Sequence, residues 1–218
     1  MKLICEVADD QALQFLEEAD ASGGKKLYIQ GPFLQAEQPN KNHRQYRIET
    51  LQREVKRYNE NYVQKNRAYG ELGHPQGPTI NLDRVSHMIV KLEQSGNDFI
   101  GKAKITDTPS GNIVKALMGE GASLGVSSRG MGSLKDIGSG LSEVQDDYYL
   151  ATPADIVADP SAPDAFVQGI MENKEWTCVE GIWMEQHLDA AKKFINNTPA
   201  PELNAAKIKV FEAFIQSL

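Results

Sequence analysis

The chain has 218 residues, of which 40% are hydrophobic, so it is long enough to bury the core of one ordinary globular domain. Its 30 acidic and 23 basic residues give a formal net charge of −7, which argues against a general affinity for nucleic-acid backbone. No apolar run approaches the roughly 20 residues of a membrane span, and the start, MKLICEVADD, lacks the apolar stretch of a signal peptide. Cys5 and Cys178 lie far apart, without metal-type spacing, and we expect reduced, inert thiols in a cytoplasmic protein.

The predicted elements of the first hundred residues are strands with one helix between them. Residues 26–37 are typical of two extended pieces divided by a Gly-Pro break. Apolar side chains at steps of three and four predict an amphipathic helix over 47–60. The alternation of side chains in residues 98–106 predicts a half-buried strand.

The same mixture continues to about residue 172. Residues 109–119 predict a short helix that ends at a glycine, and residues 123–129 predict a short strand. Residues 146–157 form another expected extended segment, which Pro153 interrupts. Short strands with helices between them indicate an α+β fold, and we expect a barrel decorated by helices.

Beyond residue 172 the character of the sequence changes. Residues 173–185 are typical of a linker or a strand-like piece, and two helices are expected over 184–196 and 202–218. We therefore divide the chain into one domain over 1–172 and a C-terminal helical tail over 173–218, which either regulates or docks the domain.

The stretch GVSSRGMG, residues 125–132, places two serines and an arginine in a glycine-rich frame. A turn would explain the glycines and a strand edge would explain the serines, whereas a nucleophile beside an oxyanion site would explain both. In a strand the hydroxyls of Ser127 and Ser128 point to opposite faces, so only one of them can meet a given base.

A nucleophilic serine needs a general base, and the chain offers four histidines. His43 and His187 lie in polar surroundings, and His87 lies in an apolar stretch where it would line a helix or strand. His74 stands out because the glycine before it permits an unusual backbone geometry and the proline after it restricts that geometry. The ordinary alternative is a loop histidine without a catalytic role.

The base in turn usually needs an orienting carboxylate. Asp155 lies between apolar residues in the extended segment that follows the serine strand. A carboxylate buried there would be costly unless it were paired. The alternative is an exposed aspartate at the end of a strand.

Three runs of the sequence together carry a resemblance to a known family: AYGELGHP at 68–75, LGVSSRGMGSL at 124–134 and DIVADPSAPDAF at 155–166. They resemble the prohead core proteases of T-even-like tailed phages and, more distantly, other phage prohead proteases and the herpesvirus assemblins. With LYIQGPFLQAE at 27–37, the resemblance covers residues 26–166. It implies a Ser-His-acid endopeptidase with an assemblin-like compact β-barrel surrounded by helices, and no metal or organic cofactor.

The resemblance also implies which residues form the catalytic pair. His74 matches the family histidine. The preferred nucleophile is Ser128, because the SRG run at 128–130 fits the Ser-x-Gly pattern of the wider class. Ser127 is the alternative nucleophile.

The remaining roles are implied in the same way. Asp155 is the preferred acid, and Glu71, three residues before the histidine, is the alternative. Backbone N–H groups near Gly130 would hold the oxyanion. Arg129 would either add charge to that site or lie on the surface.

The implied substrates are other head proteins, namely scaffold, core proteins and the major capsid protein, cleaved inside the assembling prohead in the host cytoplasm. No nucleic-acid or membrane partner is expected, self-association is left open, and an inactive precursor would suit an enzyme that is enclosed with its substrates. Two alternatives remain: a catalytically silent assembly protein with a protease fold, and a small-molecule esterase. The absence of a G-x-S-x-G elbow argues against the esterase.

T-even-type enzymes resemble one another in cutting after a glutamate two residues beyond an aliphatic residue. Such triplets end at Glu172, where the compact core ends, and at Glu6 and Glu18 near the start. We predict that self-cleavage after Glu172 removes the tail. Mass spectrometry should find a truncated form of the active enzyme that is missing from Ser128→Ala, and identical intact masses would contradict the prediction.

Overall fold

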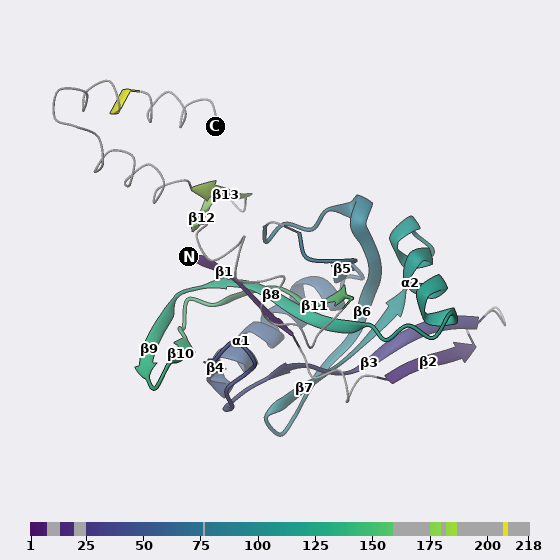
Figure 1. The fold of residues 1–218 in the computed structure, drawn as a ribbon, viewed down its shortest axis with the longest axis horizontal. Coiled ribbons are helices and arrows are strands. Elements are labelled where there is room, and N and C mark those ends of the chain that lie inside the picture. Colours follow the sequence, from purple (N-terminus) through teal and green to yellow (C-terminus); the bar gives the residue numbers. More distant parts are fainter. Residues whose placement is uncertain are drawn as a thin grey trace. The chain divides into compact units, whose positions relative to one another are not determined.

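The computed structural model describes residues 1–7, 14–19, 25–75, 77–158, 175–179, 182–186 and 207–208 (Figure 1). The chain forms two compact units, Met1–Glu172 and Asn173–Leu218. In the second unit, β12 (Glu175–Val179) and β13 (Ile182–Gln186) form an antiparallel pair.

The sequence predicts a helix from residue 184, and β13 shows that this boundary is wrong. The β-branched and aromatic residues of EWTCV and IWMEQ favour strands, and this preference prevails over the weak helical spacing. Residues 207–208 are helical, and the rest of the two predicted tail helices lies outside the described residues.

The central strand of one sheet carries both serines. This strand, β8 (Gly125–Gly132), pairs antiparallel with β1 (Lys2–Val7) on one side and with β11 (Tyr149–Val157) on the other. All eight of its residues are buried. Because both edges of β8 are paired, the direction of each of its side chains is fixed by the alternation of the strand.

The other described strands of the first unit form two further sheets. One is a five-stranded antiparallel sheet in the order β2 (Gln14–Ala19), β3 (Lys25–Gln35), β7 (Asp98–Ile105), β6 (Val85–Ser95) and β5 (Tyr69–Glu71). The other has the order β4 (Arg44–Tyr46), β10 (Leu141–Val144) and β9 (Leu134–Gly138). The fold is therefore mixed and strand-rich, and the closed barrel that we expected is not found among the described strands, which divide among separate sheets.

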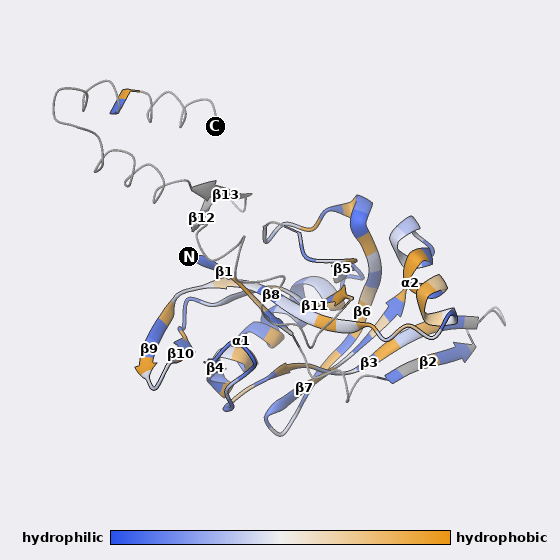
Figure 2. Ribbon diagram, in the orientation of Figure 1, coloured by the Kyte–Doolittle hydropathy of each residue, from blue (hydrophilic) through white to orange (hydrophobic). Residues whose placement is uncertain are grey.

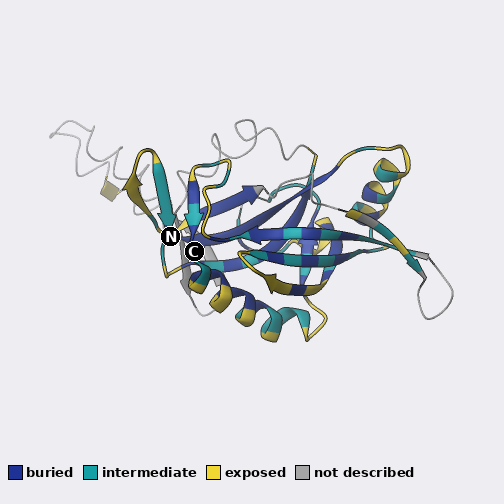
Figure 3. Cartoon of the chain, turned by 90° about the horizontal axis from the view of Figure 1, so that it is seen from below, coloured by how far each residue is buried: buried dark blue, intermediate teal, exposed yellow. Residues whose placement is uncertain are grey.

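Two α-helices cover parts of these sheets. α1 (Ile48–Tyr58) is amphipathic, with Leu51, Val55 and Tyr58 in the core, and it continues into the π-helical turn η2 (Asn59–Val63) (Figure 2). α2 (Pro109–Gly119) begins after Thr108, whose side chain accepts from the N–H of Gly111. Figure 3 shows the buried residues in the central strands and the exposed residues on the outer faces of the helices.

The helices predicted over 47–60 and 109–119 and the strand predicted over 98–106 are confirmed as α1, α2 and β7. The expected break in residues 26–37 is wrong, because β3 runs through Pro32 without interruption. A register shift against β7 between Pro32 and Leu34 accommodates the missing proline N–H.

Gly101 of β7 lies against the ring of Phe33, which would come within 1.9 Å of an added Cβ atom. Gly101→Ala should therefore lower the free energy of unfolding by about 1–3 kcal/mol, because the ring or the strand must move. Gly119→Ala is the control, since a Cβ atom added there would meet nothing within 4 Å beyond its chain neighbours and the backbone of its own helix. Chemical denaturation measures the free energy of unfolding of both variants. Equal values for Gly101→Ala and Gly119→Ala would contradict the packing argument.

Candidate active site

The two serines of β8 face different surroundings. Ser127 lies directly opposite Asp155 of β11 in the strand register, whereas Ser128 lies opposite Glu6 of β1. Directly paired residues of antiparallel strands point to the same face of a sheet. Ser127 therefore shares a face with Asp155, and Ser128 shares the opposite face with Glu6.

Ser128 faces the core. It lines a small cavity whose described lining includes Glu6, Phe33 and Tyr46 but no histidine. Glu6 accepts hydrogen bonds from the Arg44 guanidinium at 3.4 Å and from the Tyr46 hydroxyl at 3.2 Å. Burial raises the pKa of Glu6 even so. This face holds a structural polar cluster, and its described residues offer Ser128 no imidazole base.

His74 reaches the other face of the sheet because its backbone runs along β11. Leu72 forms a parallel bridge with Ile156, and the Gly73 N–H donates to the Ile156 carbonyl at 2.7 Å. Gly73 has a φ of +75°, a conformation that glycine adopts without strain. The next residue, His74, has its Nδ1 atom 3.5 Å from Asp155 Oδ2, with 7% of its side chain exposed.

The buried polar atoms without hydrogen-bond partners among the described residues include three on this face: Ser127 Oγ and both ring nitrogens of His74. All three are buried, where polar atoms are nearly always paired. The 3.5 Å separation of His74 from Asp155 exceeds an ordinary hydrogen bond, and such catalytic contacts are often long in the absence of substrate. A hydroxyl, an imidazole and a carboxylate of this kind can act as nucleophile, base and orienting acid.

Asp155 is fully buried and ionised. Its Oδ1 accepts from the Glu71 N–H at 2.9 Å, and its Oδ2 accepts from Arg129 Nε at 2.8 Å. Burial alone would raise the pKa of Asp155, but the charge and the hydrogen bonds of Arg129, together with the His74 ring nearby, hold this pKa below its usual value.

Arg129 is also fully buried, so the surface position that we considered for it is wrong. Its guanidinium donates to Asp155, to Glu71 and to the carbonyls of Gly77 and Thr79. These five hydrogen bonds match the five N–H donors of an arginine side chain. In this arrangement the side chain has no donor left for an oxyanion, because two buried carboxylates and two carbonyls occupy it.

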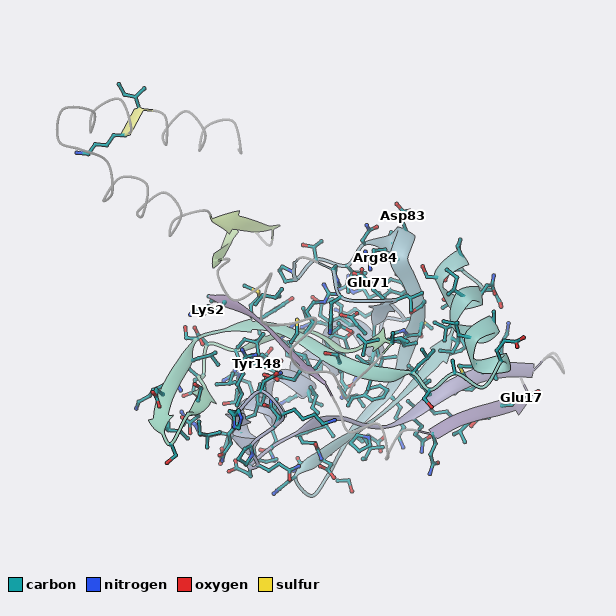
Figure 4. The ribbon with its side chains drawn as sticks, viewed as in Figure 1. Lys2, Glu17, Glu71, Asp83, Arg84 and Tyr148 are labelled. Atoms are coloured by element: carbon teal, nitrogen blue, oxygen red, sulfur yellow. The ribbon has the colours of Figure 1, made fainter. Side chains whose placement is uncertain are left out.

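The alternative acid, Glu71, has other partners. Its carboxylate accepts from the Asn81 N–H at 2.9 Å and from Arg129 Nη2 at 3.2 Å. Arg84 Nε lies 3.6 Å from Glu71 Oε2, and Figure 4 labels both residues. Burial raises the pKa of Glu71. The carboxylate that lies 3.5 Å from the His74 ring is that of Asp155.

Gly130 has a packing reason to be glycine. The ring of Tyr148 would come within 2.5 Å of a Cβ atom at this position. A role for its backbone N–H in an oxyanion site stays a prediction.

His87 is a core residue of β6, as its apolar context suggests. Its Nε2 lies 3.0 Å from the Ala154 carbonyl, its Nδ1 lies 2.9 Å from Ser86 Oγ, and burial lowers its pKa. The ring fills the space beside Gly70. His43 is exposed, and His187 lies outside the described residues.

Within the described part of the chain, no group of His, Cys, Asp and Glu side chains could hold a metal ion. None of the helices in that part has the length and apolar character needed to cross a membrane. Cys5 is a buried free thiol, and burial raises its pKa to about 12, whereas the side chain of Cys178 lies outside the described residues.

Asp155→Asn should lower the free energy of unfolding at pH 7 by up to about 3–5 kcal/mol, because it removes a charged partner of buried Arg129. The folded pKa of Asp155 lies below its usual value of 3.8, so the carboxylate stabilises the fold at neutral pH and loses this contribution as the pH falls. The stability gap between wild type and variant should therefore narrow from about pH 5 downward. Denaturant unfolding at several pH values measures this difference in stability. A difference that widens in acid would contradict the conclusion that Asp155 is ionised and paired with Arg129.

Comparison with known proteins places these residues in a family. Residues 6–175, which include the His74 loop and strands β8 and β11, match the Peptidase_S77 family, described as prohead core protein serine protease. The chain is 38% identical over 143 residues to the prohead core protein protease of Enterobacteria phage T4, covering 65% of this chain and 68% of that protein. Its fold is similar to the structure of the bacteriophage T4 capsid assembly protease, gp21, with a TM-score of 0.69 and 30% identity over 73% of this chain and 98% of that one. The chain belongs to the prohead core protein serine protease family.

Proposed function

We propose that the protein is a serine endopeptidase of phage head maturation in which Ser127 is the nucleophile, His74 the base and Asp155 the orienting acid. Membership of the protease family supports the peptidase activity. The observation that carries the assignment is the shared position of Asp155, which lies opposite Ser127 in the strand register and 3.5 Å from the His74 ring.

The choice of Ser127 over Ser128 rests on the two faces of β8. The Ser-x-Gly pattern favours Ser128, but that side chain shares the core face with Glu6. Ser127 shares its face with Asp155, and its Oγ is buried without a partner among the described residues. A hydroxyl that must give its proton to His74 has to lie on the face that His74 covers.

The chemistry is acyl transfer. Ser127 Oγ attacks the scissile carbonyl carbon while its proton passes to His74, and the ionised Asp155 holds the imidazole in position. His74 then gives the proton to the leaving amine as the C–N bond breaks. Water, whose proton passes to His74, hydrolyses the acyl-enzyme and regenerates the Ser127 hydroxyl. The oxyanion is held by backbone N–H groups near β8, with Gly130 as the candidate.

The substrates in this proposal are proteins of the phage head: scaffold, core proteins and the major capsid protein, cleaved inside the assembling prohead. The T4 relatives, a prohead core protein protease and a capsid assembly protease, support this setting. Self-cleavage after Glu172, which lies outside the described part of the chain, remains part of the proposal. Its inactive control is now Ser127→Ala, because Ser128→Ala is expected to stay active. Glu6 is a poor cleavage site, because it is buried in β1 beside β8.

A fluorophosphonate probe should label wild type and Ser128→Ala at residue 127. Both proteins should also cleave a co-expressed scaffold protein. Ser127→Ala should lose both activities, with cleavage falling by a factor on the order of 10⁵–10⁶, because it removes the proposed nucleophile. Peptide mass spectrometry of the labelled protein locates the site, and thermal unfolding shows that each variant is folded.

Each other result points to a different conclusion. Loss of labelling in Ser128→Ala but not in Ser127→Ala would move the nucleophile to the core-facing serine. Labelling without protein cleavage would favour a small-molecule esterase. The absence of both labelling and cleavage would favour a silent assembly protein.

A further inference from the structure

One guanidinium contacts the histidine loop on both sides of His74. Before the histidine, Arg129 Nη2 donates to Glu71 Oε1 at 3.2 Å. After the histidine, Arg129 Nη1 donates to the carbonyl of Gly77 and, at 3.2 Å, to the carbonyl of Thr79. The two arms of the loop are therefore tied to a single side chain of β8.

The same guanidinium also binds the acid that lies beside the histidine ring. Arg129 Nε donates to Asp155 Oδ2 at 2.8 Å, and Nη2 lies 3.4 Å from Oδ1. Asp155 Oδ2 is the oxygen that lies 3.5 Å from His74 Nδ1. The loop and the acid thus share one rigid, fully buried anchor.

We propose that Arg129 is a positioning residue, which clamps the loop over residues 71–81 to the sheet and thereby holds His74 against Asp155 and Ser127. This inference rests on the proposed function, because it assigns the means by which the base is held in place. It gives the arginine a role that differs from binding an oxyanion.

The loop needs such an anchor because it has little regular structure of its own. Between β5, which ends at Glu71, and the 3₁₀ turn η3 (Leu82–Arg84), the described residues form neither a helix nor a strand. The contacts at Gly77 and Thr79 are to backbone carbonyls, so they hold the path of the chain itself. A catalytic group that moves by about 1 Å can lose roughly 100-fold in rate.

The clamp depends on the shape of the guanidinium as well as on its charge. Its five N–H donors spread over three nitrogens and reach two carboxylates and two carbonyls. A lysine at this position would keep the charge but would offer three donors on one atom. Arg129→Lys therefore separates a clamp from simple neutralisation of the buried carboxylates Glu71 and Asp155.

The chain offers a matched control on the opposite face of the same sheet. Arg44 is also buried and pairs with a buried carboxylate, Glu6, at 3.4 Å. Arg44→Lys reports the general effect of replacing a buried, paired guanidinium, without touching the hydrogen bonds of Arg129.

The test measures the second-order rate constant of fluorophosphonate labelling at Ser127, below the melting temperature of each variant. Arg129→Lys should lower this constant by about 100-fold, whereas Arg44→Lys should stay near the wild-type value. Hydrogen–deuterium exchange should speed up in residues 72–81 of Arg129→Lys only. A wild-type labelling rate in Arg129→Lys, or an equal fall in Arg44→Lys, would overturn the clamp.

Two further arrangements keep the test decisive. If Arg129→Lys does not fold, Glu71→Gln weakens the anchor before His74, and Glu6→Gln is its control. Slower labelling in Glu71→Gln alone supports the clamp, and equal rates in both variants refute it. If wild type is not labelled, the proposed function fails. The rate of hydrogen–deuterium exchange in residues 72–81 still decides whether Arg129 holds the loop.

Discussion

The buried ion pair between Arg129 and Asp155 is the interaction on which the candidate site depends. It links β8 to β11 inside the sheet and, through Glu71, Gly77 and Thr79, it ties the histidine loop to both strands. A buried charge that loses its partner destabilises a protein strongly, so each member of this network requires the others. The same interactions that stabilise the fold thereby set the positions of the groups that would do the chemistry.

The alternation of β8 separates two polar environments within one sheet. On the core face, Ser128 lies with Glu6, which binds Arg44 and Tyr46. On the other face, Ser127 lies opposite Asp155. Each face has its own buried carboxylate paired with its own arginine. The hydroxyls of two adjacent serines therefore lie in different polar environments.

Three of the unpaired buried polar atoms lie on the second of these faces. Ser127 Oγ and both nitrogens of His74 are buried without partners among the described residues, whereas the carboxylate next to them is fully bonded. Unpaired buried polar atoms cost stability, and proteins keep them mainly where function requires them. In the proposed mechanism, the acid is already fixed while the base and the nucleophile have no partners, which suits a reaction that begins when a substrate enters.

The sequence by itself determined α1, α2 and β7, and it singled out His74, the serine pair and Asp155, because periodicity, glycine spacing and apolar flanks are local features. It did not predict that β3 would continue through Pro32, that β13 would replace the start of a helix, or that Arg129 would be buried. The Ser-x-Gly pattern of the wider class favoured Ser128, whereas the proposed nucleophile is Ser127. That choice depends on which residue of β8 lies opposite Asp155, and strand register is set by long-range pairing and packing, which only the tertiary structure supplies.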